Sequence, residues 1–69
     1  MSMQIQFNQK MIQINQIRPL LSELLSSEGI HGDYFAVVVN DQLIPRSSYQ
    51  AYVINEGDKV DVITPMQGG

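Results

Sequence analysis

The first part of the chain alternates polar and apolar residues with a period of two. Residues 4–7 alternate strictly, and the pattern resumes over residues 11–14, where Ile12 and Ile14 are expected to face inward. This period is typical of a strand with one buried face. Residues 8–9, Asn-Gln, form a plausible tight turn between the two runs. We therefore predict an antiparallel hairpin.

The period changes after residue 18, where leucines recur at i, i+1, i+4 and i+5. This spacing forms a wide apolar stripe on a helix. Pro19 suits the first turn, where its missing N–H is not needed. Arg18 is a poor N-cap, so a start near Asn15 is the alternative. Gly29 can end the helix in a left-handed cap. The stripe is predicted to be core: Leu20, Leu21, Leu24 and Leu25.

The second half of the sequence is rich in strand formers. Residues 34–39, Tyr-Phe-Ala-Val-Val-Val, lack alternation, which favours a strand covered on both sides or central in a sheet. Asn40-Asp41 predicts a turn. Residues 42–44 then form a short strand, which should lie at an edge because Pro45 ends it.

The remaining segments complete the predicted domain. Residues 46–54 are irregular, with room for a short helical turn, and residues 56–58 form a turn. Residues 59–64 alternate again, with Val60 and Val62 on one face. The resulting order of strand, strand, helix, strand, strand, strand predicts a single α+β domain with one helix across one sheet.

Composition narrows the classes of function. The chain has 69 residues, 43% of them hydrophobic, no cysteine and a net charge of −3. Its four cations are scattered, which argues against nucleic-acid binding, since a phosphate-tracking surface needs several cations on one face. No apolar run approaches the length of a membrane span, and no secretion signal is evident. We expect a soluble, cytoplasmic protein.

Side-chain chemistry offers few candidates. Ser47, Ser48 and His31 are the possible nucleophiles and base, but nothing in their spacing pairs them. There is no cysteine or histidine cluster for zinc, so no metal site is predicted. The acidic residues 56, 58 and 61 are expected to belong to a solvated turn and strand face. The glycines at 29 and 32 follow the helix, where the dipole has the wrong sign for a phosphate.

The C-terminal residues stand out chemically. Pro65 is a poor continuation of a sheet, because it cannot donate a backbone hydrogen bond. Gly68 and Gly69 lack a Cβ and form a narrow end with a free carboxylate. Such an arm can enter a tight channel in another protein. A carboxylate must be activated before a nucleophile attacks it, and joining it to AMP would supply a leaving group.

Several segments together resemble the sulfur-carrier proteins of thiamin biosynthesis. They are the tail 65–69, the turn at 57–58, and residues 39–40 leading to residues 45–46. The resemblance covers nearly the whole chain from Met3. It implies a ubiquitin-like β-grasp fold, with a mixed sheet of four or five strands packed on one helix. The domain would span residues 1–64, followed by a flexible tail at residues 65–69.

The resemblance also implies a mechanism centred on Gly69. An adenylyltransferase of the ubiquitin-activating type would use ATP and magnesium to adenylate its carboxylate. Sulfur from cysteine, supplied through a cysteine desulfurase, would convert it to a thiocarboxylate, and thiazole synthase would accept the sulfur. The chain would be a co-substrate rather than an enzyme and would bind no cofactor itself. The residues entering the partners' channels would be Pro65, Met66, Gln67 and Gly68.

Three alternatives remain open. A Gly-Gly end also occurs in the small-subunit type of sulfur carrier of molybdopterin synthase. It occurs as well in ubiquitin-like modifiers, which form amide bonds with lysines. A non-catalytic interaction domain with an inert tail is the third. Gln67 and the short chain favour the thiamin pathway over the molybdopterin pathway.

Overall fold

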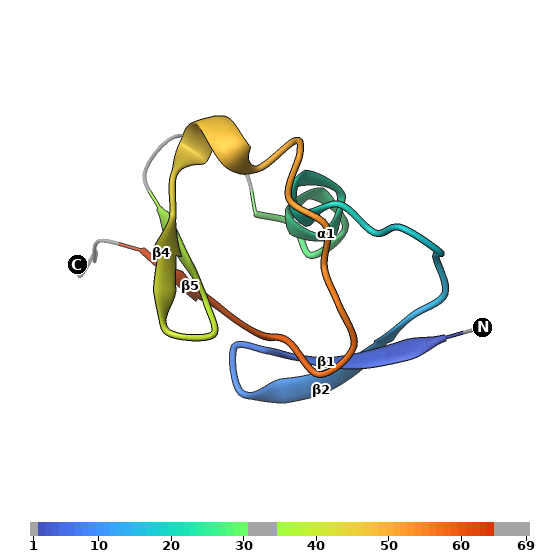
Figure 1. The fold of residues 1–69 in the computed structure, drawn as a ribbon. Helices are drawn as coiled ribbons and strands as arrows, with labels where there is room; N and C mark the ends of the chain where they lie inside the picture. The colour runs from blue at the N-terminus through green and yellow to red at the C-terminus, as the bar shows by residue number, and fades with distance from the viewer. Residues whose placement is uncertain (1, 31–34, 65–69) are drawn as a thin grey trace.

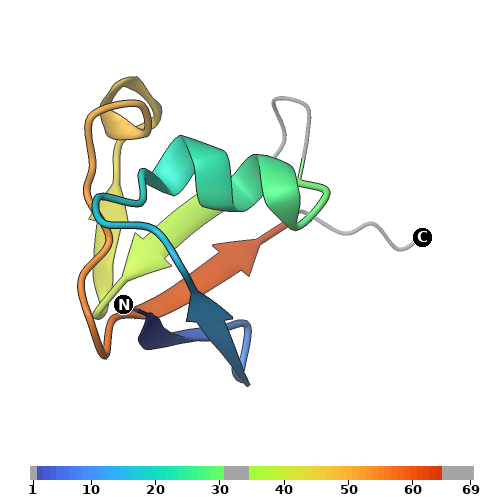
Figure 2. The same ribbon diagram turned by 90° about the vertical axis from the view of Figure 1, so that its right-hand side faces the viewer.

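A computed structural model of the chain describes residues 2–30 and 35–64 (Figures 1 and 2). In this part of the chain, five strands form one mixed sheet in the order β2-β1-β5-β3-β4, and a single α-helix covers one face. The predicted α+β fold class is confirmed. The elements are β1 (Met3–Phe7), β2 (Lys10–Ile14), α1 (Leu21–Ser27), β3 (Ala36–Val39), β4 (Gln42–Ile44), the 3-10 helix η1 (Arg46–Ser48) and β5 (Lys59–Ile63).

The last strand occupies the centre of the sheet. β5 pairs in parallel with β1 through Gln6↔Lys59 and Phe7↔Val60, and it pairs antiparallel with β3 from Ala36↔Ile63 to Val39↔Val60. The hairpins β1–β2 and β3–β4 thus flank it on its two sides. Figure 2 shows β5 running across the sheet towards the C-terminus of the chain.

Both hairpins have turns of two residues, as predicted. Asn8 and Gln9 have φ angles of 49° and 70°, and Asn40 and Asp41 have φ angles of 52° and 69°. Two successive positive φ angles are the mark of the type I′ turn, whose twist matches that of the flanking strands. Asparagine and aspartate tolerate this region better than most residues, which explains their place in these turns.

The helix begins later than the sequence indicates. α1 starts at Leu21 with Leu20 at the N-cap, so Pro19 lies before the first turn and a start near Asn15 is wrong. No side chain caps this end. Instead, Leu21 N donates to Tyr52 O at 2.8 Å and Ser22 N donates to the carbonyl of residue 49 at 3.0 Å. Main-chain carbonyls from the later segment therefore satisfy two donors that a cap normally satisfies.

The other end of the helix agrees with the prediction. Gly29 has a φ angle of +79° and follows the last helical residues. Its N–H donates to Ser26 O, and Ile30 N donates to Leu25 O. These two bonds form a Schellman motif, which satisfies carbonyls that the helix leaves free.

The core lies between α1 and one face of the sheet. The helix contributes three of the predicted leucines as buried residues, whereas Leu20 is only half-buried. In the part of the chain that is described, the buried apolar residues are Ile5, Phe7, Leu21, Leu24, Leu25, Val37, Val39, Ile44, Tyr49, Ile54 and Val60.

The prediction for residues 34–39 is confirmed only in part. β3 is interior to the sheet, between β5 and β4, but it is covered on one face only. Val37 and Val39 are buried against the core, while Ala36 and Val38 are half-buried on the outer face. The short strand β4 lies at an edge as predicted, with Pro45 after it. No helix in the described ranges is long and apolar enough to cross a membrane.

Candidate functional site

The five residues predicted to carry the chemistry lie outside the part of the chain that the structure describes. They are Pro65, Met66, Gln67, Gly68 and Gly69. The geometry available is that of the scaffold leading to them. This scaffold is β5 up to Ile63 and Thr64, with the two hairpins that hold it.

A buried carboxylate fixes the start of β5. Asp58 is 7% exposed, so the expectation that it belongs to a solvated turn is wrong. Its Oδ2 accepts a hydrogen bond from Asn55 N, and its Oδ1 accepts one from Asn40 Nδ2, both at 2.9 Å. The carboxylate therefore joins the 55–58 turn to the β3–β4 turn.

Asn40 holds β5 from the β3 side. Its N–H donates to Lys59 O at 2.8 Å, and its Oδ1 accepts from Lys59 N at 3.0 Å. The asparagine thus uses main chain and side chain together on the first residue of the strand. With Asp58, it fixes where β5 begins.

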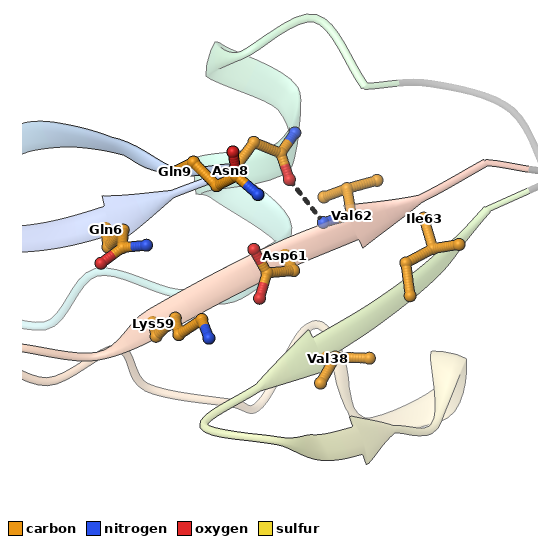
Figure 3. Close-up of a pocket in the computed structure, with 8 residues that line it drawn as sticks. All are labelled: Gln6, Asn8, Gln9, Val38, Lys59, Asp61, Val62 and Ile63. Carbon is orange, nitrogen blue, oxygen red and sulfur yellow. Dashed lines mark hydrogen bonds between the residues drawn. The ribbon is translucent and has the colours of Figure 1, made fainter.

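Asn8 holds β5 from the β1 side. Its N–H donates to Val60 O at 2.9 Å, and its Oδ1 accepts from Val62 N at 2.7 Å, as Figure 3 shows. In the described residues, the β1 register with β5 ends at Phe7↔Val60. The Asn8 amide oxygen therefore replaces the carbonyl that a longer β1 would offer, and it extends support along β5 towards its end.

The outer face of the sheet carries apolar side chains beside the end of β5. We define the outer-face patch as Val38, Leu43 and Ile63. Leu43 is 68% exposed and Ile63 is 56% exposed, while Val38 is half-buried and lies opposite Leu43 in the β3–β4 register. Large apolar side chains gathered on a solvent-facing surface are typical of a protein interaction site.

A shallow depression lies beside this patch. Figure 3 shows Lys59 and Asp61 on the β5 part of it, with Gln6 and the Asn8-Gln9 turn at one side and Val38 and Ile63 at the other. The opposite charges and amides make this side of the outer face polar. The described part of the chain has no group of three His, Cys, Asp or Glu residues placed to hold a metal.

Ser47 and Ser48 lie on η1. His31 lies outside the described residues, so the structure describes no pairing between it and these hydroxyls. The same region has a cation–π cluster. The Arg46 guanidinium lies 5.0 Å from the Phe35 ring centroid and 5.8 Å from that of Tyr49, and the two rings stack 6.0 Å apart. This cluster joins η1 to the start of β3, and we interpret it as structural.

Comparison with known proteins identifies the family. A family model described as the ThiS family matches residues 5–69. The chain belongs to the ThiS family. The match includes the Gly-Gly end and nearly all of the described fold. It confirms the predicted resemblance.

Solved structures agree with this assignment. The chain is 26% identical to the thiamine biosynthesis protein (ThiS) from Geobacter metallireducens, with a TM-score of 0.82 against its crystal structure. That comparison covers 97% of this chain and 100% of the other. An NMR solution structure of a thiamine biosynthesis protein from the same organism gives a TM-score of 0.77 at 26% identity, covering 97% of this chain and 88% of the other. A search of curated proteins found no match.

Sequence reasoning missed the residues that hold the scaffold. Asn8, Asn40 and Asp58 were interpreted only as turn residues, although each bonds to or next to β5. Local sequence contains no sign of these bonds, because the partners are 18 and 54 positions away in the chain. The outer-face patch had a weaker signal. If Val60 and Val62 face inward, alternation alone directs Ile63 outward.

Proposed function

We propose that this protein is the sulfur carrier of thiazole formation in thiamin biosynthesis. The observation that carries the proposal is the extent of the family match, which runs to Gly69 and so includes the chain end where the chemistry would occur. The likeness to the Geobacter thiamine biosynthesis protein over its full length supports the thiamin pathway. On this proposal the chain is a co-substrate that is used and regenerated, not a catalyst.

The reaction would proceed in two steps at the Gly69 carboxylate. In the first, a carboxylate oxygen attacks the α-phosphorus of ATP, the bond to pyrophosphate breaks, and an acyl-adenylate forms. The activating enzyme would bind the ATP and magnesium. In the second, sulfur at the oxidation level of hydrosulfide attacks the carbonyl carbon and AMP leaves. The product is a thiocarboxylate, whose sulfur thiazole synthase then incorporates.

The scaffold supports this proposal physically. Asn8 and Asn40 fix β5 on both of its sides, so the direction in which the chain leaves the domain after Ile63 is determined. The outer-face patch lies beside that point and offers apolar area to a partner that accepts the tail. An activating enzyme or acceptor could thus bind a rigid surface and receive residues 65–69 at the same time.

The deciding experiment measures mass. The purified chain is incubated with a ThiS-activating enzyme, ATP, magnesium and sodium sulfide, and the intact protein is analysed by mass spectrometry. We expect one oxygen to be replaced by sulfur at the C-terminal residue. A chain lacking Gly69, and one extended by a single alanine, serve as controls and should stay unchanged.

Two results would contradict the proposal. One is an unchanged mass with an enzyme that activates another ThiS protein under the same conditions. The other is sulfur incorporated equally into the extended chain, since that chain no longer ends in the glycine carboxylate.

A further inference from the structure

The two edges of the sheet differ in how they are protected. β4, at one edge, has three residues and is followed by Pro45. β2, at the other edge, has five residues without proline: Lys-Met-Ile-Gln-Ile. Natural proteins shorten or interrupt edge strands, because an open edge pairs with other chains. β4 follows this rule and β2 does not.

The hydrogen-bond pattern shows which groups of β2 are open. Gln6 N donates to Asp58 O and Gln4 O accepts from Gly57 N, so these two residues of β1 point away from β2. Their neighbours along β1 therefore point towards β2, and the alternation of an antiparallel ladder leaves Met11 and Gln13 directed outward. Each offers one N–H and one C=O to an incoming strand.

A groove lies beside this open edge. It runs between β2 and α1, and its apolar part is formed by Ile12 and Ile14 from the strand and by Pro19 and Leu24. Side chains of an added strand that point to the helix side would enter this groove. Backbone bonds at an edge, together with alternate side chains in an adjacent groove, are the elements of peptide binding by strand addition.

Charge indicates the chemistry of the occupant. Glu23 and Glu28 of the helical region line the groove, and no lysine or arginine does so. Lys10 is the first residue of β2 and lies outside the lining. A second copy paired through β2 about a two-fold axis normal to the sheet would bring two such acidic pairs together, which is unfavourable. A segment with basic residues beside its apolar ones is complementary.

We propose that the β2 edge binds an extended, basic segment of another protein by strand addition. The segment pairs with the outward groups of Met11 and Gln13, places alternate apolar side chains beside Ile12 and Ile14, and directs lysine or arginine to the two glutamates. This surface is separate from the outer-face patch. It does not depend on chemistry at Gly69.

The test uses the full chain, labelled with ¹⁵N, and the peptide acetyl-Lys-Thr-Val-Thr-Val-Thr-Lys-amide. Its alternate residues place Lys, Val, Val and Lys on one face. We expect saturable NMR shifts at the amides of Met11 and Gln13 and at the helix residues lining the groove. Affinity should fall as salt is added, since exposed charge pairs are screened. A peptide with both lysines replaced by glutamate should bind more weakly.

Matched variants separate backbone pairing from other effects. Gln13→Pro removes one outward donor and leaves the bonds to β1 in place, so affinity should fall about tenfold. Gln13→Thr keeps the N–H and should bind like the parent. The double variant Glu23→Gln, Glu28→Gln leaves the strand untouched and should weaken binding about fivefold at low salt. A chain lacking Gly69 should bind unchanged.

Several results would overturn the proposal. Absence of shifts at Met11 and Gln13, or shifts confined to the outer-face patch, would remove the site. Equal binding of the parent, Gln13→Pro and the glutamine double variant would do the same. A dimer of the free chain with Met11 and Gln13 amides protected from exchange would assign the edge to a second copy instead.

Discussion

The hairpins β1–β2 and β3–β4 have the same turn and opposite fates. Each has a two-residue turn that begins with asparagine, and both turn residues have positive φ angles. Each asparagine then accepts a hydrogen bond from a β5 backbone N–H through its side-chain oxygen. The central strand is therefore clamped from both sides by the same residue type in the same turn.

The difference lies in what surrounds each clamp. Asn40 also donates to the buried Asp58, and β4 ends at Pro45, so this hairpin is tied to the core and its edge is closed. Asn8 has one side-chain bond, and β2 leaves an open edge beside a groove. Identical local structure thus gives a closed edge on one side of β5 and an open one on the other.

The largest expected effect comes from the core side of the two edge strands. Ile44 of β4 is 7% exposed and Ile12 of β2 is half-buried. Ile44→Ala should lower the free energy of unfolding by about 3 kcal/mol, because it leaves a cavity, whereas Ile12→Ala should lower it by about 1 kcal/mol. Urea denaturation followed by circular dichroism measures both. Equal losses would mean that the two hairpins are equally tied to the core.

Asp58→Ala tests the tie that only the β3–β4 hairpin has. The change removes two hydrogen bonds to a buried carboxylate and leaves Asn55 N without its partner. We expect a loss of about 2 to 3 kcal/mol in unfolding free energy. Asp61→Ala, on the outer part of the same strand, is the control and should change stability by less than about 0.5 kcal/mol. A loss as small as that of the control would show that the buried carboxylate contributes little.

Replacing each asparagine by glycine compares the clamps directly. Glycine keeps the positive φ angle without steric cost, so only side-chain bonds are lost. Asn40→Gly loses two such bonds and should cost about 2 kcal/mol, and Asn8→Gly loses one and should cost about 1 kcal/mol. Hydrogen exchange at Lys59 N and Val62 N locates each effect. Faster exchange at the wrong end of β5 would contradict the assignment.

The smallest effect on stability is expected on the outer face. Leu43 and Met11 are 68% and 60% exposed, on the edge strands of the two hairpins. Replacing either by lysine should change stability by less than about 0.5 kcal/mol. If the outer-face patch binds the activating enzyme, Leu43→Lys should slow adenylation about tenfold and Met11→Lys should not. ATP–pyrophosphate exchange measures this rate. Equal rates for both variants would exclude the patch from that contact.

Much of the fold was predictable from local sequence. The alternation of residues 4–7 and 11–14, the Asn-led turns, the leucine stripe and Gly29 each specify an element through neighbours within a few positions. The start of the helix was not predictable in this way. Its first N–H groups bond to carbonyls of Tyr52 and of residue 49, which a reader of residues 15–21 cannot anticipate.

The candidate site divides along the same line. The sequence by itself identified the chain end, because Gly68-Gly69 and a free carboxylate are properties of the residues alone, and the resemblance depended on them. Only the tertiary structure decided that Asp58 is buried, that β5 lies between two hairpins, and that β2 has an open edge. These features arise from pairing between residues up to 54 positions apart, and such pairing has no local pattern in the chain.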